Sequence, residues 1–364
     1  GTIGTVADKT AYGYVKKYLD ERGLSVTRAE ENRMTAGCAG IKRTTGQHPG
    51  GAIVVPTECE IYDFTPIQHP ADDKDSDIIT THFDYHSIDE NLLKLDMLGH
   101  DDPTMIKMLE DLSGINAREI PLDDPETMSI FTSIAALGIE GDELLGETGS
   151  VAIPEFGTHF VREMLKDTRP TTFDELARIS GLSHGTDVWL NNAQTLIRDG
   201  VATLREVICC RDDIMLYLIE KGVENKLSFT IMESVRKGKG LKPEWIEAME
   251  QNNVPAWYIE SCQKIKYMFP KAHAAAYVIS ALRVAWYKVY KPLAFYCAYF
   301  TARPEDVDVP TVIQGKDAVR RYLRDIKAKG KEATKKELDV YNNMLIFNEM
   351  MSRGIGVLPI DINE

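Results

Sequence analysis

The sequence predicts an α+β protein, in which a region of mixed helix and strand precedes a mainly helical region. Short apolar runs bounded by Gly and Pro, such as Gly51-Ala-Ile-Val-Val-Pro56, lie in the first hundred residues and are typical of buried strands. After Gly99, helix-start signals and helical spacing of apolar residues take over. The length of 364 residues, of which 43% are hydrophobic, suffices for two or three globular units.

The first hundred residues contain one clear helix and several candidate strands. Helical spacing predicts a helix from Thr10 to Arg22 that ends at Gly23. Besides the run at Gly51, the segments Ile78–Phe83 and Leu92–Leu98 are expected to be extended, the latter as a buried strand.

The remainder is punctuated by helix caps. Asp102-Pro103 and Asp124-Pro125 each combine an N-cap with a proline at the first helical position, and Gly114 ends the first of these helices. Thr172-x-x-Glu175 is a capping box that opens a helix expected to stop at Gly181. Further helices are expected over 231–237, 243–250, 271–290, 311–329 and 331–353.

Composition excludes several classes of protein. Six cysteines without a C-x-x-C pair exclude a disulfide framework or zinc ribbon and indicate a reducing compartment. No apolar run approaches the ~18 residues of a membrane span. The first residue is not Met, and we expect the chain to be part of a larger protein.

Charge is distributed unevenly within a net charge of −14. Residues 96–150 hold 13 acidic and 2 basic side chains, whereas residues 225–292 hold 11 basic and 5 acidic ones. The acidic region could bind a metal ion or repel anions, and the basic region could bind an anion. The alternative is that both regions are simply solvated faces.

Two charged side chains interrupt the apolar strand Leu92–Leu98. Alternation along the strand places Lys94 and Asp96 on one face. Asp96 is therefore a candidate metal-ligand carboxylate on a rigid strand, the alternative being an internal ion pair with Lys94 at a sheet edge. A single carboxylate cannot hold two magnesium ions, so further ligands would be required.

Three other segments are candidates for phosphate or base contact. Thr45–Gly51 has paired glycines whose N–H groups can bind an anion, although a tight turn explains them equally. Ser183–Asp187 lacks the G-x-S-x-G elbow of a hydrolase, which leaves an N-cap turn or a polar contact. Arg236–Gly240 places three cations on a glycine-broken loop, either as a helix C-cap or as a movable phosphate ligand.

The segment that opens with Lys271 combines a cation and a helix start. Phosphates bind favourably at such a position, and His273 and Tyr277 follow on one helical face with alanines between them. The alternative is a core helix with a hydrogen-bonded histidine.

The order of these motifs resembles that of the C-family bacterial replicative DNA polymerases, and within them the PolC type of low-GC Gram-positive bacteria. The resemblance rests on T-G-Q-H-P-G-G, L-L-K-L-D-M-L-G-H-D-D-P-T, G-L-S-H-G-T-D-V-W, R-K-G-K-G and P-K-A-H-A-A-A-Y, and extends over the whole chain. It implies that residues 1–100 are the C-terminal part of a nucleotidyltransferase-like palm with a mixed β-sheet. Residues 101–300 would then be α-helical fingers, and residues 301–364 the start of a duplex-DNA-binding region.

The resemblance also implies roles for individual residues. Asp96 would be the third catalytic carboxylate and a ligand to one of two Mg²⁺ ions, with Lys94 as its neighbour and the other ligands upstream. Nucleotide-binding residues would be Ser183, His184, Gly185, Thr186, Arg236, Lys237, Lys239, Lys271, His273 and Tyr277. Primer contacts would come from Arg43, His48, Gly50 and Gly51.

The implied substrates are primer-template DNA and dNTP, and the implied location is the bacterial cytoplasm at the nucleoid, without membrane contact. A sliding clamp and other replisome proteins would bind regions outside this chain. The family's first two catalytic aspartates, its phosphoesterase-like domain and its exonuclease are expected upstream, so the chain alone is expected to be inactive. Two alternatives remain: a non-catalytic DNA-binding module, which would need no Asp96, and a magnesium-dependent phosphohydrolase, which would need no template.

Overall fold

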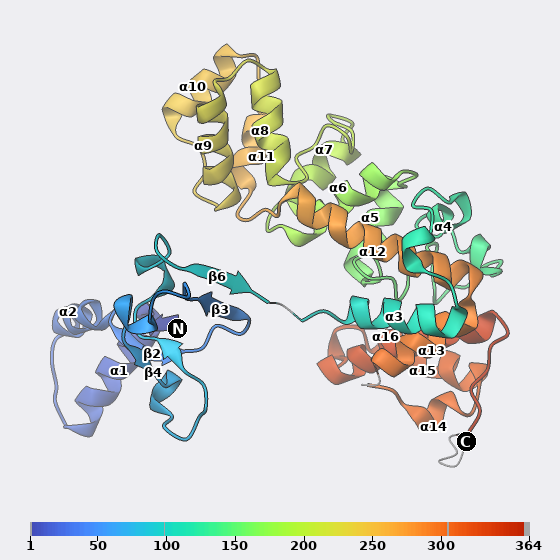
Figure 1. Cartoon of the computed structure of the whole chain (residues 1–364), viewed down its shortest axis with the longest axis horizontal. Coiled ribbons are helices and arrows are strands. Elements are labelled where there is room, and N and C mark those ends of the chain that lie inside the picture. Colours follow the sequence, from blue (N-terminus) through green and yellow to red (C-terminus); the bar gives the residue numbers. More distant parts are fainter. Residues whose placement is uncertain (1, 98, 304–305, 360–364) are drawn as a thin grey trace. The chain divides into compact units, whose positions relative to one another are not determined.

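The computed structural model describes residues 2–97, 99–303 and 306–359. The chain divides into two compact units, Gly1–His100 and Asp101–Glu364 (Figure 1). All named strands lie in the first unit, whereas the named elements of the second are helical, so the predicted α+β class is confirmed.

The first unit contains two helices and three separate two-stranded sheets among its described residues. Its elements are β1 (Thr2–Thr5), α1 (Asp8–Glu21), α2 (Arg28–Cys38), β2 (Lys42–Gly46), β3 (Gly51–Val54), β4 (Ile67–Gln68), β5 (Thr80–Thr81) and β6 (Leu93–Asp96). The pairs are β1 with β2, β3 with β6 and β4 with β5, and each pair is antiparallel. A mixed sheet needs a parallel pair and its crossover connection. The expected mixed sheet is therefore wrong for the described residues.

Strand β6 alternates as predicted but is not buried. Leu93 and Leu95 are 61% and 46% exposed, because the apolar core of this unit forms around α1 instead. Ala11, Val15 and Leu19 are buried at helical spacing on α1. The β3–β6 ladder thus leaves both charged side chains of β6 accessible from solvent.

The second unit is a helical assembly. Its helices are α3 (Asp101–Ser113), α4 (Pro125–Ser129), α5 (His159–Thr168), α6 (Phe173–His184), α7 (Gln194–Arg198), α8 (Arg211–Glu220), α9 (Asn225–Arg236), α10 (Pro243–Gln251), α11 (Ala256–Lys264), α12 (Lys271–Tyr290), α13 (Pro292–Ala302), α14 (Val309–Val312), α15 (Lys316–Lys329) and α16 (Lys335–Ser352). Among the described residues, none of these helices is long and apolar enough to cross a membrane.

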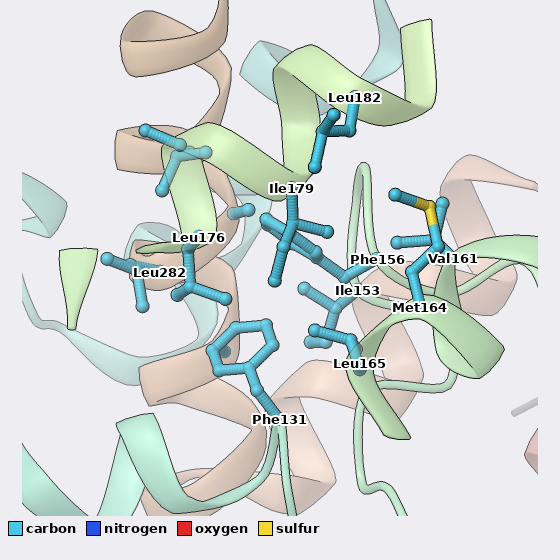
Figure 2. Packing of buried hydrophobic residues seen from close by; sticks show 14 of the residues in the cluster. Phe131, Ile153, Phe156, Val161, Met164, Leu165, Leu176, Ile179, Leu182 and Leu282 are labelled. Carbon is cyan, nitrogen blue, oxygen red and sulfur yellow. The ribbon is translucent and has the colours of Figure 1, made fainter. Parts of the chain in front are cut away.

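Helix α12 runs through the second unit and packs against α3, α4, α6 and α13 (Figure 1). Its small and branched side chains, such as Ala281 and Leu282, are buried because the neighbouring helices approach it closely. Leu282 joins Phe131, Phe156 and Leu176 in one apolar cluster (Figure 2). This cluster holds α6 and the loop before α5 in place beside α12.

The predicted helix starts at Pro125, Phe173, Pro243 and Lys271 are confirmed. The Asp124 carboxylate accepts the Thr127 N–H at 2.8 Å, as an N-cap does. Others are wrong: Asp102 lies inside α3 and is not its N-cap, and the helices predicted from residues 231 and 331 begin at Asn225 and Lys335. The segment 311–329 contains the end of α14 and all of α15, two helices that Gly315 separates.

One predicted stop is also wrong. Helix α6 instead continues past Gly181 to His184. A Cβ at Gly181 would lie 2.6 Å from the Cys209 carbonyl oxygen, so this glycine permits close packing within the helix and does not end it.

Candidate functional site

In the first unit, the structure brings together most of the residues expected near the primer terminus. Asp96 ends β6 opposite Gly51 of β3. Lys94 Nζ lies 3.4 Å and His48 Nε2 lies 3.9 Å from Asp96 Oδ1. His48 Nδ1 accepts the Gly50 N–H at 3.2 Å, which directs Nε2 of a neutral ring toward the carboxylate.

Gly51 is needed where it stands, because a Cβ there would lie 2.8 Å from His48 Nδ1. Lys94 Nζ is held from the other side by the Tyr85 ring, at 4.7 Å from its centroid. Arg43 lies elsewhere in this unit, over the Tyr14 ring on a polar hollow formed by β2.

Asp96 suits a divalent cation as one ligand of several. Its side chain is half-exposed, carries hard oxygen donors and ends a strand. The part of the chain that the structure describes contains no cluster of three or more His, Cys, Asp or Glu side chains that could hold a metal ion. Asp96 could therefore supply one oxygen ligand, with the remaining ligands from outside these residues.

In the second unit, backbone hydrogen bonds join three segments that are distant in the sequence. Thr186 N–H donates to the Tyr267 carbonyl at 2.9 Å, and Lys266 N–H donates to the Thr186 carbonyl at 3.1 Å. Met268 N–H donates to the Arg236 carbonyl at 3.3 Å. The end of α6, the end of α9 and the start of α12 therefore meet at one place.

Two glycines make this junction possible. A Cβ at Gly185 would lie 2.9 Å from the Tyr267 carbonyl oxygen, and one at Gly238 would lie 2.5 Å from the Lys266 carbonyl oxygen. Gly238 also has φ +69°, which favours glycine. The first glycine of Arg236–Gly240 thus serves close packing against the segment before α12. Movement of this loop remains a prediction.

The cations at this junction are paired. Arg236 donates two hydrogen bonds to the Glu233 carboxylate, the second at 2.8 Å, and Lys237 Nζ lies 3.1 Å from the same group. The hydrogen bonds from Arg236 chiefly lower the pKa of Glu233 to about 2. Lys239, on the same loop, is exposed.

Lys271 begins α12 as predicted, but its backbone N–H is not free. It donates to Asp212 Oδ2 at 2.6 Å, while Lys271 Nζ lies 3.8 Å from Asp174 Oδ1. One of the N–H groups expected to receive a phosphate is therefore occupied by a carboxylate.

Ser183 and His184 form the last turn of α6, and the structure supports their exclusion as a nucleophilic pair. The Ser183 hydroxyl donates to the Ser180 carbonyl at 2.9 Å. His184 Nδ1 lies 2.7 Å from the same oxygen and must therefore carry a proton. A protonated Nδ1 cannot accept the serine proton, although the two side chains are only 3.2 Å apart.

Aromatic rings line the junction beside these groups. His273 and Tyr277 lie one turn apart on one face of α12, as their spacing predicted. Their ring centroids are 4.4 Å apart and their planes are tilted by 43°. Phe269 and His184 approach His273 at 5.0 and 5.7 Å. These rings form a continuous half-buried aromatic surface at the start of α12.

Two family models match this chain. Residues 2–99 match the bacterial DNA polymerase III alpha NTPase domain, and residues 102–253 match the bacterial DNA polymerase III alpha subunit finger domain. The chain belongs to the bacterial DNA polymerase III alpha family.

Relatives of this polymerase III alpha chain align along all of it. DNA polymerase III PolC-type from Caldanaerobacter subterraneus subsp. tengcongensis is 64% identical over 362 residues, and the proteins of that name from Staphylococcus haemolyticus and Oceanobacillus iheyensis are 58% identical over 364 residues. The alignments include 100% of this chain but only 25–26% of those proteins, so the chain spans about a quarter of their length.

Two residues that contact the junction, Glu233 and Glu155, are not among those predicted from the sequence. Glu233 was signalled by its i−3 and i−4 spacing from Arg236 and Lys237 on a helix, where such pairs interact. Glu155 had no signal, because it lies in a loop far from the junction in sequence. It nevertheless contacts His184 Nε2 at 2.8 Å.

Proposed function

We propose that this chain is part of a replicative DNA polymerase. Residues 1–100 form the C-terminal part of the palm, residues 101–300 the fingers, and residues 301–364 the start of the duplex-DNA-binding region. The reaction is template-directed nucleotidyl transfer. The primer 3′-oxygen bonds to the α-phosphorus of a dNTP, the bond to pyrophosphate breaks, and the hydroxyl proton leaves. The similarity of the whole chain to PolC-type proteins supports this activity.

The observation that carries the proposal is the meeting of α6, α9 and α12 at one junction. There Arg236, Lys237, Lys239 and Lys271 bind the triphosphate, in concert with the α12 N-terminus. His273 and Tyr277 pack beside the nascent base pair. Gly185 and Thr186 supply the backbone that holds this junction together, and Ser183 and His184 end the helix that supports it.

In the palm, Asp96 serves as a catalytic carboxylate and as one ligand to a pair of Mg²⁺ ions. Such ions supply charge neutralisation for the phosphoryl group and a more acidic primer hydroxyl. Lys94 holds Asp96 in place, while His48, Gly50, Gly51 and Arg43 contact the primer strand. The sliding clamp and other replisome proteins bind regions outside this chain, in the bacterial cytoplasm at the nucleoid.

The test uses the full-length protein in primer-extension and DNA-binding assays. Asp96→Asn is expected to lower turnover by a factor of ~100 or more with unchanged DNA affinity and melting temperature, since one oxygen ligand and one charge are lost. An active Asp96→Asn enzyme would contradict the catalytic role and favour a non-catalytic DNA-binding module. Nucleotide hydrolysis that needs no template would favour a phosphohydrolase.

The nucleotide site has its own test. Charge-assisted hydrogen bonds contribute about 1.5–3 kcal/mol each, so Lys271→Ala and Arg236→Ala should each raise the dNTP KM about ten- to hundredfold. DNA affinity should change little. The opposite pattern, weaker DNA binding with a shallower salt dependence, would place these cations on the duplex instead.

A further inference from the structure

Glu155 lies in a loop whose backbone is unusually constrained. Its φ is +68° and that of Ala152 is +63°, in the left-handed region that side chains other than glycine rarely adopt. Such conformations persist only where the surroundings impose them, and they gather at functional sites. The side chain that the Glu155 carboxylate contacts therefore indicates the role of this conformation.

Neighbouring residues impose this conformation. Ile153 and Phe156 are 2% and 0% exposed and point into the cluster with Leu165 and Leu176 (Figure 2). The Ser150 hydroxyl donates to the Phe156 carbonyl at 2.9 Å and closes the loop. Glu155, between the two buried side chains, is directed away from the apolar cluster toward the end of α6.

The Glu155 carboxylate meets a histidine that needs a second acceptor. His184 Nδ1 donates to the Ser180 carbonyl at 2.7 Å, so only Nε2 remains, and it lies 2.8 Å from Glu155 Oε2. Ser180 Oγ lies 3.3 Å from the same carboxylate oxygen. With a carbonyl on one nitrogen and a carboxylate on the other, the ring is doubly protonated.

This pairing is reflected in the protonation of both groups. The hydrogen bond that His184 donates to Glu155 raises the pKa of His184. For Glu155 the largest single effect is burial, which raises its pKa, but the hydrogen bonds from His184 and Ser180 and the charge of the histidines together outweigh burial, and the pKa of Glu155 is lowered. The titratable groups that face His184 are Glu155 from the loop and His273 from α12, with Tyr277 behind it.

With both nitrogens engaged inside the protein, His184 has no N–H left for a nucleotide. Its ring instead packs edge-on against Phe269 at 5.5 Å and His273 at 5.7 Å. His273 in turn packs against Tyr277, with ring centroids 4.4 Å apart. The orientation of the aromatic surface at the start of α12 therefore depends on how the His184 ring is held.

We propose that Glu155 is a positioning residue of the nucleotide site. It fixes the His184 ring, against which His273 packs, and His273 in turn contacts Tyr277. This inference rests on the proposed polymerase function. Glu155 itself touches no nucleotide. It acts from a rigid loop through His184, so that the α12 aromatic surface keeps one orientation when a nucleotide enters.

The test measures dNTP KM, kcat and DNA affinity in the full-length protein. Glu155→Ala removes a charged hydrogen-bond partner and should raise the dNTP KM roughly tenfold, with kcat and DNA affinity within about twofold. Glu155→Gln keeps an acceptor for Nε2 without the charge, and should raise KM by less. Glu143→Gln is the matched control, because Glu143 pairs with Arg324 at 2.7 Å outside the site, and it should leave all three constants unchanged.

The pH profile separates positioning from a purely structural role. When His184 loses a proton, one of its two hydrogen bonds is lost, so the wild-type dNTP KM should rise as pH increases through the His184 pKa. Glu155→Gln should move this inflection to lower pH by about one unit, because the carboxylate no longer stabilises the cation. Loss of the inflection in His184→Gln assigns it to His184 and not to His273.

The outcomes are distinguishable. An unchanged KM and pH inflection in both Glu155 variants would overturn the inference, even if Lys271→Ala confirmed the nucleotide site. If Glu155→Ala does not fold, the inflection in Glu155→Gln decides alone. A wild-type protein that extends no primer would instead refute the proposed function.

Discussion

Lys288 of α12 is fully buried and offers a sharp test of what stabilises the helical unit. Its Nζ lies 2.8 Å from Glu349 of α16, whose side chain is also fully buried, and donates to the carbonyls of Gly149 and Val151 at 2.7 and 2.5 Å. Tyr296 OH donates at 2.7 Å to Glu349 Oε1, the same oxygen that Lys288 Nζ approaches. One ammonium group therefore joins α12, α16 and the loop before α5.

The magnitude follows from what each substitution leaves behind. Lys288→Met leaves a buried carboxylate without its cation and should lower the free energy of unfolding by about 3–5 kcal/mol. Lys288→Met with Glu349→Met removes both charges. It leaves two buried carbonyls without their donor, as the single variant does, and Tyr296 OH without its acceptor, at about 1–3 kcal/mol for each such group. Only the single variant carries the additional cost of an unpaired buried carboxylate. The double variant is thus expected to be more stable than the single Lys288→Met variant.

The assay is urea unfolding followed by tryptophan fluorescence. All four tryptophans, at positions 189, 245, 257 and 286, lie in the helical unit, so the signal reports that unit alone. Lys166→Met is the matched control, because Lys166 forms an exposed pair with Glu163 and should cost less than about 1 kcal/mol. A Lys288→Met cost as small as that of the control, or a double variant less stable than the single one, would refute the reasoning.

Three further predictions concern the same unit. Gly238→Ala and Gly240→Ala both place a side chain at φ near +70°, at a cost of about 1–2 kcal/mol. Only Gly238→Ala also meets a backbone carbonyl, so equal unfolding free energies would contradict the packing role. Because the pKa of Glu233 is lowered from 4.5 to about 2, its pairing stabilises the fold above pH 4.5 and is lost as pH falls toward 2. Glu233→Gln should therefore flatten stability over that range, and an unchanged slope would contradict the pairing. A thiol reagent should modify exposed Cys297 at pH 8 but not Cys262, because burial raises the pKa of the Cys262 thiol to about 12. Mass spectrometry would detect the modified residue, and modification of Cys262 before Cys297 would contradict this prediction.

The sequence alone predicts those features that depend on residues close to one another in the chain. Helix α12 begins at Lys271 and ends at Tyr290 as predicted, because the helical spacing of its side chains is a local signal. The predicted stop at Gly181 was wrong because this glycine is required by the close approach of the Cys209 carbonyl, which comes from another part of the chain. Burial of β6 failed for a related reason, since periodicity gives the faces of a strand but not what covers them.

The candidate sites show the same division. The spacing of His273 and Tyr277 predicted that they share one face of α12, and helical spacing also accounts for the pairing of Arg236 with Glu233. Glu155 could not be predicted, because a left-handed backbone at a residue other than glycine leaves no mark in the sequence. Only the folded loop brings it to His184.

We expect the pairing of the cations to give the proposed nucleotide site part of its selectivity. Arg236 and Lys237 share Glu233, and the start of α12 at Lys271 is occupied by Asp212. Arg236 and Lys237 are thus held in place, and one of their two charges is neutralised by Glu233. A triphosphate carries enough charge, in one compact group, to replace several carboxylates at once, whereas an isolated phosphate of a passing DNA backbone does not. If the junction binds a nucleotide as proposed, this pre-pairing would disfavour weak polyanion contacts there while still allowing a triphosphate to bind.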